Sequence, residues 1–500
     1  MKIGWRVRYV LAELPEPVSP LPFVSELPGD WPGWLKEDGV VVGTPFLISP
    51  SFEYDVELNA FFRSVEMVGD AWNTQVGYAR DVMAFLDFLW TSRDERSWRD
   101  ATEADHTAYL AWRRKDENGP RIADSTWDRE VAAVNRFYRW QVRAGNLAGN
   151  PIPQRERRVM PAGAGRGRPR GTVSGEIPAT YSHGAGRERI EWLPAASYRR
   201  WRDVGMRGYT PDGLPDPKFR GRWAGRNSTF CDLMVRTGLR LAEQSALTVF
   251  EVPLERGLAG YQRFWLPPVI AKGGSARWIY VPASIVAELV AYAEVDRAVI
   301  VEDARAAGRY QRIRRPLVVE DPSRPVVRSA EGHRVKLAQL APDERRRLLV
   351  DGPNGLEPAA FWLSEYGMPV AASTWKDLFR QANLRCQAWE VNLHAFAHLL
   401  RHTFAVITLE QLQRGHIAAL TALTPQQRGH YTRVFGDPLD WVRRRLGHRS
   451  VVTSQIYLHA LAELEMETRM ALVPDEWEDP RDTPADDVPD DTLAPQGTAA

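Results

Sequence analysis

A stretch that cannot build a core constrains this chain most, because it divides the remaining residues into two parts. Residues 151–186 are rich in glycine, proline and arginine and poor in apolar side chains. Such a segment buries too little apolar surface to offset the entropy lost on ordering. We therefore expect a flexible basic linker over residues 152–189, with a folded part on each side. A division also suits 500 residues, since single cores stop growing near about 250–300 residues.

The part before the linker is predicted to be helical from residue 56 to residue 151. From residue 74 an apolar stripe recurs at helical spacing, and Thr102 and Ser125 are candidate N-caps of two further helices. The members of the stripe are Tyr78, Val82, Phe85, Leu86 and Leu89. Residues 1–55 are proline-rich without periodicity, and we expect them to form an irregular arm.

The part after the linker, residues 190–473, is predicted to combine helices with one hairpin. Residues 192–201 and 227–247 have helical patterns, whereas residues 269–272 and 276–281 are β-branched and aromatic runs joined by Gly-Gly-Ser. The expected fold class is therefore α+β, mainly α with a small antiparallel β-sheet in the second part.

Charge, cysteine content and the lack of apolar runs indicate the cellular compartment that we expect for this protein. The net charge is only +1, but residues 474–500 hold nine carboxylates against Arg481, which leaves +9 on the rest of the chain. We expect that acidic tail to be disordered. Cys231 and Cys386 form no CxxC pair, no apolar run reaches the ~20 residues of a membrane span, and no signal-type segment follows Met1. A cytoplasmic protein without membrane contact is expected.

Six side chains of the second part fit one kind of chemistry. Arginines supply permanently charged, bidentate donors for phosphate oxygens, and a tyrosine can act as a covalent nucleophile. Lysine and histidine can give or take the protons. This set cradles and attacks a phosphodiester without a metal. Its members are Arg240 in TGLR, Lys272 in AKGG, His398 and Arg401 in HLLRHTFA, His448 in LGH, and Tyr457.

The order of these six residues resembles that of the tyrosine recombinase (phage integrase) family. The resemblance covers about residues 190–473 and, more weakly, about residues 60–151. It implies a core-binding, SAM-like DNA-binding domain over residues 56–151 and a catalytic domain over residues 190–473. It further implies strand cleavage through a 3′-phosphotyrosyl link, without cofactor or ATP, in the integration or excision of a mobile element. Double-stranded DNA is the implied partner, with a homotetramer on DNA and an accessory directionality protein.

The resemblance also assigns roles to the residues. Tyr457 is the nucleophile, Arg240 and Arg401 neutralise the non-bridging oxygens, and Lys272 protonates the departing 5′-oxygen. His398 accepts the tyrosine proton and His448 donates to the phosphate. Two residues are expected to support these: Glu243 orients Arg240, and His402 braces the motif from behind. Relative to the usual family spacing, residues 300–358 and 411–437 look inserted.

Alternatives remain at several positions. His394, His398 and His402 recur at helical spacing, but no carboxylate or cysteine ligand accompanies them, so we expect no metal site. Candidate DNA-contacting arginines could form a solvated face, although the presence of the six site residues favours phosphate contact. They are Arg129, Arg136, Arg139, Arg143, Arg166, Arg168 and Arg170. At the level of function, the competitors are a type IB topoisomerase-like nicking and closing enzyme and a catalytically idle DNA-binding relative.

Overall fold

The computed structural model describes residues 4–14, 29–156, 176–182, 190–221, 223–319, 321–328, 332–421, 437–450, 453–458 and 460. The chain divides into two compact units, Met1–Glu188 and Arg189–Ala500. Each unit has its own hydrophobic cluster of buried side chains. No helix in the described ranges is both long enough and apolar enough to cross a membrane.

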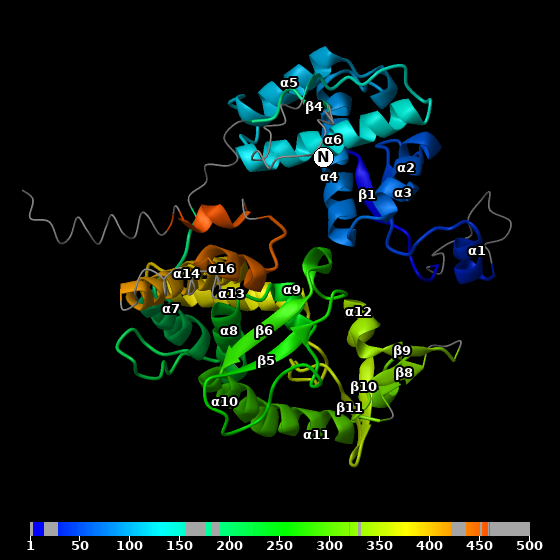
Figure 1. Ribbon diagram of the computed structural model, residues 1–500. Coiled ribbons are helices and arrows are strands. Elements are labelled where there is room, and N and C mark those ends of the chain that lie inside the picture. The colour runs from blue at the N-terminus through cyan, green and yellow to red at the C-terminus, as the bar shows by residue number, and fades with distance from the viewer. Residues whose placement is uncertain are drawn as a thin grey trace, which may run out of the picture. The chain divides into compact units, whose positions relative to one another are not determined.

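Unit 1 is a helical body with short strand pairs (Figure 1). Strand β1 pairs antiparallel with β2, and β3 pairs antiparallel with β4. The elements are β1 (Arg6–Tyr9), α1 (Trp31–Glu37), β2 (Pro45–Ile48), α2 (Val56–Arg63), α3 (Val65–Val68), α4 (Trp72–Ser92), η1 (Trp98–Asp100), α5 (Glu103–Arg114), α6 (Asp124–Arg143), β3 (Gln154–Glu156) and β4 (Glu176–Pro178).

The expected helices of unit 1 are present. The stripe residues Val82, Phe85, Leu86 and Leu89 of α4 are buried in the unit's core. Thr102 caps α5 in a reciprocal arrangement with Asp105, as its position predicts. The cap expected for α6 was wrong, because that helix begins at Asp124 and Ser125 lies inside it.

The N-terminal arm is more regular than expected. Its described residues include β1, α1 and β2, and the Trp5 amide donates to Asp87 of α4 at 2.7 Å. Two described parts of the expected linker likewise form strands, β3 and β4. Each strand finds its partner about 20 to 40 residues away along the chain. Local periodicity carries no signal for such pairings.

Unit 2 surrounds helix α8 with other helices and a hairpin. The elements are α7 (Ala195–Trp201), η2 (Arg202–Arg207), α8 (Ala224–Thr237), α9 (Leu241–Ser245), β5 (Tyr261–Leu266), η3 (Lys272–Gly274), β6 (Arg277–Pro282), α10 (Ala283–Ala291), η4 (Tyr292–Arg297), α11 (Ala298–Ala306), η5 (Tyr310–Arg312), β7 (Leu317–Val319), β8 (Val326–Arg328), β9 (Arg334–Lys336), η6 (Leu337–Gln339), α12 (Pro342–Arg345), β10 (Leu348–Gly352), β11 (Gly355–Pro358), α13 (Ala372–Ala388), α14 (Ala397–Thr421) and α16 (Pro438–Leu446).

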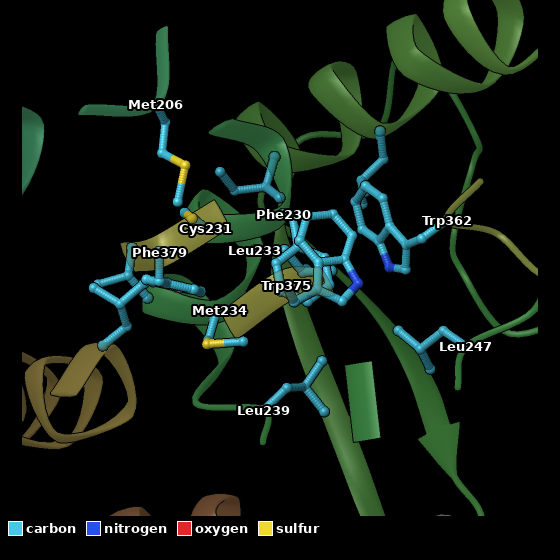
Figure 2. Packing of buried hydrophobic residues seen from close by; sticks show 14 of the residues in the cluster. Met206, Phe230, Cys231, Leu233, Met234, Leu239, Leu247, Trp362, Trp375 and Phe379 are labelled. Atoms are coloured by element: carbon cyan, nitrogen blue, oxygen red, sulfur yellow. The ribbon is translucent and has the colours of Figure 1, made fainter. Parts of the chain in front are cut away.

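Aromatic packing fixes the centre of unit 2. Phe230 of α8 stacks on Trp375 of α13 with ring centroids 3.6 Å apart, and Trp362 meets both rings edge-on (Figure 2). All three side chains are almost fully buried. Large rings at such a contact contribute a few kcal/mol each through buried area. This rigid centre holds the end of α8, from which the candidate site begins.

The second strand of the expected hairpin is present as β6, but the first strand lies earlier in the chain than the sequence suggested. That first strand is β5, paired with β6 so that Trp265 faces Trp278, and residues 269–272 belong to the connection rather than to a strand. Gly273 and Gly274 both have positive φ, which suits a tight turn inside that connection.

The stretch that looked inserted, residues 300–358, has cores of its own. Strand β10 pairs antiparallel with β11 and parallel with β7, and β8 pairs antiparallel with β9. Two further clusters of buried apolar residues lie in this region. The second such stretch, 411–437, continues α14 to Thr421, and residues 422–436 lie outside the described ranges. The expected fold class, mainly helical with small antiparallel sheets, is confirmed, with one parallel strand pair in addition.

Candidate active site

The turn between α8 and α9 positions Arg240. Gly238 ends α8 with φ 66°, and a Cβ there would lie 2.4 Å from the ring of Phe404. Glycine is therefore required by both backbone conformation and space. The chain then enters α9 with Arg240 as its N-cap residue. The Arg240 guanidinium donates to the Glu243 carboxylate at 2.9 Å, and the Arg240 amide donates to the same carboxylate at 3.0 Å.

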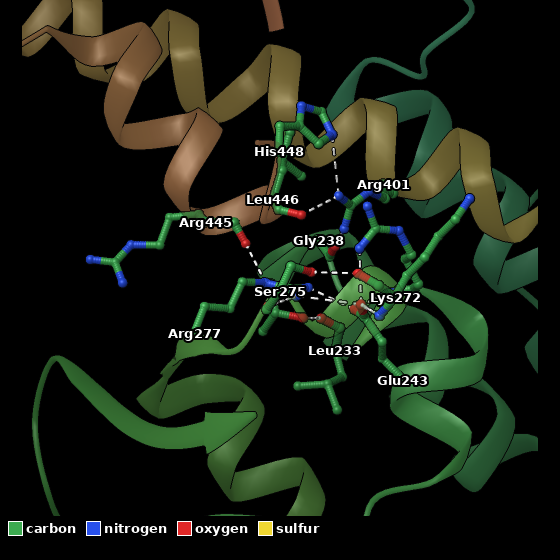
Figure 3. A network of polar contacts seen from close by, with 12 residues as sticks. Leu233, Gly238, Glu243, Lys272, Ser275, Arg277, Arg401, Arg445, Leu446 and His448 are labelled. Atoms are coloured by element: carbon green, nitrogen blue, oxygen red, sulfur yellow. Dashed lines mark hydrogen bonds and ion pairs between the residues drawn. The ribbon is translucent and has the colours of Figure 1, made fainter. Parts of the chain in front are cut away.

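Glu243 is the centre of a buried polar network (Figure 3). Its side chain is 1% exposed and accepts from Arg240, from Arg277 at 2.6 Å and from the Lys272 amide at 3.3 Å. Burial alone would raise the pKa of Glu243, but the hydrogen bond and charge of Arg277, together with Arg240, lower it to about 2. The expected orientation of Arg240 by Glu243 matches this geometry.

Lys272 lies on the connection between β5 and β6. Its amide is held by Glu243, whereas its side chain is exposed. The carbonyl oxygens of Lys272 and Gly273 accept from Ser275 and Arg449 respectively. The ammonium group is therefore carried by an anchored backbone and remains free to extend.

Arg401 is almost entirely buried, at 1% exposure, in helix α14. Its guanidinium donates to the carbonyl oxygens of Gly238 and Leu446, which end α8 and α16. Burial and the charges of Arg240 and Arg277 lower the pKa of Arg401 to about 9. The guanidinium thus links the C-terminal ends of α8 and α16 by hydrogen bonds, and its positive charge lies inside the site.

His448 follows the αL cap Gly447 at the end of α16. Its Nδ1 lies 2.9 Å from the Ser454 hydroxyl, and its Nε2 lies 3.4 Å from the Arg401 guanidinium. Because arginine only donates, Nε2 accepts and Nδ1 carries the proton in this arrangement. Burial and nearby Arg401 lower the pKa of His448 to about 4. A donor role toward phosphate would require His448 to gain a proton or change tautomer.

Tyr457 lies in the short helical segment 453–458 and is 1% exposed. Burial raises the pKa of its phenol, while the charges of Arg401 and Arg240 act in the opposite direction. Its ring lies parallel to that of His448, with centroids 6.3 Å apart. The phenol is therefore within electrostatic reach of both arginines.

The histidines of α14 differ from expectation in their placement. His402 Nδ1, rather than His398, lies 3.1 Å from the Tyr457 hydroxyl. The His398 ring meets the His402 ring edge-on, with centroids 4.3 Å apart. Burial lowers the pKa of His398, and the positive charges of Arg401, Arg240 and Lys272 lower it further. His394 contacts Phe396, and the described residues contain no cluster of three metal-ligating side chains.

Four of the candidate DNA-contacting arginines lie on helix α6 of unit 1. Arg129, Arg136 and Arg143 of α6 pair with Asp81, Asp70 and Glu66 respectively. Arg139 reaches only the carbonyl oxygen of Glu176, at 3.5 Å, and has no carboxylate partner among the described residues. These pairs favour the solvated-face alternative for three of the four. Arg166, Arg168 and Arg170 lie outside the described residues.

Two residues of the network were not singled out from the sequence. Arg277 shares the buried face of β6 with Ile279 and Val281, and an arginine at that phase of an alternating strand needs a buried partner. The position of Arg277 in this alternating pattern could therefore have identified it from the sequence. Ser454 is fully buried against His448, and no sequence pattern marks it.

The arrangement as a whole concentrates positive charge around a phenol. The charges of Arg401, Arg240 and Lys272 add to the burial that lowers the pKa of His398, and Glu243 is the carboxylate paired with Arg240. Such a cluster can bind an anionic group and stabilise added negative charge on it. The phenol supplies a nucleophile, and the imidazoles and the ammonium supply groups for proton transfer.

Comparison with known proteins independently supports the SAM-like domain expected in unit 1. The family model described as "phage integrase, N-terminal SAM-like domain" matches residues 58–145. The tyrosine recombinase XerC of Roseiflexus sp. (strain RS-1) is 26% identical over 184 residues, which cover 37% of this chain and 46% of that protein. The chain thus spans about half the length of the curated relative it matches.

The matched solved structures have lower sequence identity to the chain. The XerH site-specific recombinase in a post-cleavage complex with difH DNA is 14% identical, with a TM-score of 0.44 over 81% of this chain and 80% of that one. The Tn1549 transposon integrase with circular intermediate DNA is 12% identical, with a TM-score of 0.44 over 82% and 99%. These scores establish neither activity nor partner. In its N-terminal domain match and in the order of its candidate site residues, the chain is similar to the tyrosine recombinase (phage integrase) family.

Proposed function

We propose that this protein is a site-specific DNA recombinase that cuts and rejoins DNA through a 3′-phosphotyrosyl intermediate. The observation that carries the proposal is the position of Tyr457. Its ring lies parallel to that of His448, whose Nε2 is 3.4 Å from the Arg401 guanidinium, and the charges of Arg401 and Arg240 counteract the rise in the phenol's pKa that burial causes. A buried phenol whose rise in pKa is opposed by two guanidinium charges suits attack on an anionic phosphodiester.

The chemistry follows from these groups. Arg240 and Arg401 neutralise the non-bridging oxygens as charge builds in the transition state, and the exposed Lys272 ammonium protonates the departing 5′-oxygen. The new phosphotyrosyl ester conserves the energy of the phosphodiester, so rejoining needs neither ATP nor a metal. Tyr457 is buried in this structure. Either its phenol or the residues that bury it must therefore move before the phenol reaches DNA.

The remaining assignments belong to the same proposal. Residues 56–151 act as the DNA-binding core domain and residues 190–473 as the catalytic domain. The partner is double-stranded DNA at a recombination site, and the assembly is a homotetramer aided by an accessory directionality protein. Integration or excision of a mobile element is the proposed process.

Covalent trapping tests the proposal. The target site is first mapped by sequencing DNA junctions next to the gene, and a nicked suicide duplex of that site is incubated with the protein. We expect a protein–DNA adduct with the unchanged chain and none with Tyr457→Phe, while DNA binding persists. Tyr366→Phe, at an exposed tyrosine of unit 2, serves as the matched control.

The outcomes separate the competing functions. An adduct with Tyr457→Phe would show that the nucleophile is another residue, and no adduct with the unchanged chain would indicate an idle DNA-binding relative. Strand exchange between two duplexes distinguishes a recombinase from a topoisomerase-like enzyme, which would relax a supercoiled plasmid only.

A further inference from the structure

The hydrogen bond of the Tyr457 hydroxyl leads to one histidine. His402 Nδ1 lies 3.1 Å from the phenolic oxygen, and the two ring centroids are 5.7 Å apart. In the part of the chain that the structure describes, this is the only hydrogen bond of that hydroxyl. His398, one helical turn earlier in α14, contacts the His402 ring and makes no described hydrogen bond to the phenol.

The direction of that hydrogen bond follows from satisfying both groups. Burial raises the pKa of Tyr457, so its hydroxyl is protonated at neutral pH and requires an acceptor. Burial and the charges of His398 and Arg401 lower the pKa of His402 to about 4, so its imidazole is neutral. A neutral imidazole protonated at Nε2 accepts at Nδ1. The phenol therefore donates, and Nδ1 holds a free lone pair toward its proton.

We propose that His402, rather than His398, takes the proton of Tyr457 during strand cleavage. This inference rests on the proposed recombinase function. The Tyr457 O–H bond breaks as its proton moves to His402 Nδ1, and the phenolic oxygen forms a bond to phosphorus. The bond from phosphorus to the 5′-oxygen breaks, and that oxygen takes a proton from the Lys272 ammonium. The products are a phosphotyrosyl diester, a free 5′-hydroxyl, an imidazolium and a neutral amine.

The DNA phosphate itself makes this transfer easier. Positive groups, Arg401 among them, disfavour an imidazolium at His402 in the free protein. A phosphodiester bound between Arg240 and Arg401 brings one negative charge, which offsets the repulsion. The proton acceptor therefore becomes a stronger base only when substrate is present, and the phenol stays protonated without it.

Replacement of His402 by asparagine tests the role. Asparagine places an acceptor oxygen near the position of Nδ1 but cannot take up a proton. We expect His402→Asn and His402→Ala to lose roughly 10²–10⁴-fold in the rate of adduct formation, the range for a general base. His394→Asn, an exposed histidine just before α14, should retain the rate of the unchanged chain. Melting temperature and DNA binding are measured for each variant.

Two further experiments show whether His402 acts on the tyrosine nucleophile or on the leaving 5′-oxygen. A substrate with sulfur in place of the bridging 5′-oxygen needs no proton on its leaving group, so it should restore Lys272→Ala but not His402→Asn. Added imidazole should partly restore His402→Ala. Full activity of His402→Asn, or its rescue by the sulfur substrate, overturns the inference and leaves the recombinase proposal standing. Failure of the unchanged chain to form any adduct overturns the recombinase proposal instead.

Discussion

Replacing Glu243 by glutamine should destabilise unit 2 in a pH-dependent way. Glutamine keeps the shape of the side chain but removes the charge that Arg240 and Arg277 share. The pKa of Glu243 is about 2 in the folded protein against 4.5 ordinarily. At ~1.4 kcal/mol per unit of pKa, the charge contributes ~3 kcal/mol at neutral pH. Arg277, at 6% exposure, would be left without its carboxylate, and this lost pairing is already part of the ~3 kcal/mol.

The sign of the pH dependence follows from the lowered pKa. A carboxylate whose folded pKa lies below 4.5 stabilises the fold fully above that pH, and the contribution disappears as pH falls toward 2. The difference between the unchanged chain and Glu243→Gln should therefore be ~3 kcal/mol at pH 7 and about half of that at pH 3.

Calorimetric or urea unfolding over this pH range measures the effect. Glu302→Gln, at an exposed position of α11, is the matched control and should change the unfolding free energy by less than about 0.5 kcal/mol at every pH. A Glu243→Gln variant as stable as the control at pH 7 would refute the argument. So would a deficit that stays constant as the pH is lowered.

Two further predictions concern local geometry and are measured by chemical unfolding. Gly238→Ala should cost more than Gly274→Ala, because both glycines have positive φ but only at position 238 would a Cβ meet a ring, that of Phe404 at 2.4 Å. Gly274→Ala should show the conformational strain alone, about 1 kcal/mol, and equal losses would contradict the crowding argument. Thr102→Ala should cost unit 1 about 1 kcal/mol through loss of the α5 cap, whereas Thr107→Ala in the middle of the same helix should cost less. Equal stability of the two threonine variants would show that the cap contributes nothing.

Much of the fold could be predicted from periodicity. The α4 stripe and the Thr102 cap are local signals, since residues three and four apart in a helix share a face. The first strand of the β5–β6 hairpin was placed too late because the Gly-Gly-Ser turn is only one end of a longer connection. Strand β1 was missed because its partner, β2, is about 40 residues away.

The candidate site, too, divides into features that the sequence predicts and features that only the structure shows. The identities and order of Arg240, Lys272, Arg401, His448 and Tyr457 are written in the sequence, because each residue type is selected by its own chemistry. Which imidazole meets the phenol is not, since His398 and His402 both lie on α14 and differ by only one turn. The packing of the 453–458 segment against α14 decides in favour of His402.

The sequence by itself therefore determined the fold class, the helical faces and the inventory of reactive groups, all of which depend on near neighbours in the chain. Only the tertiary structure decided which charges meet. Arg277 joins Glu243 across 34 residues, and Arg401 joins the Gly238 carbonyl across 163. Such contacts depend on how distant elements pack, and buried polar groups must find their partners there because no water is available to replace them.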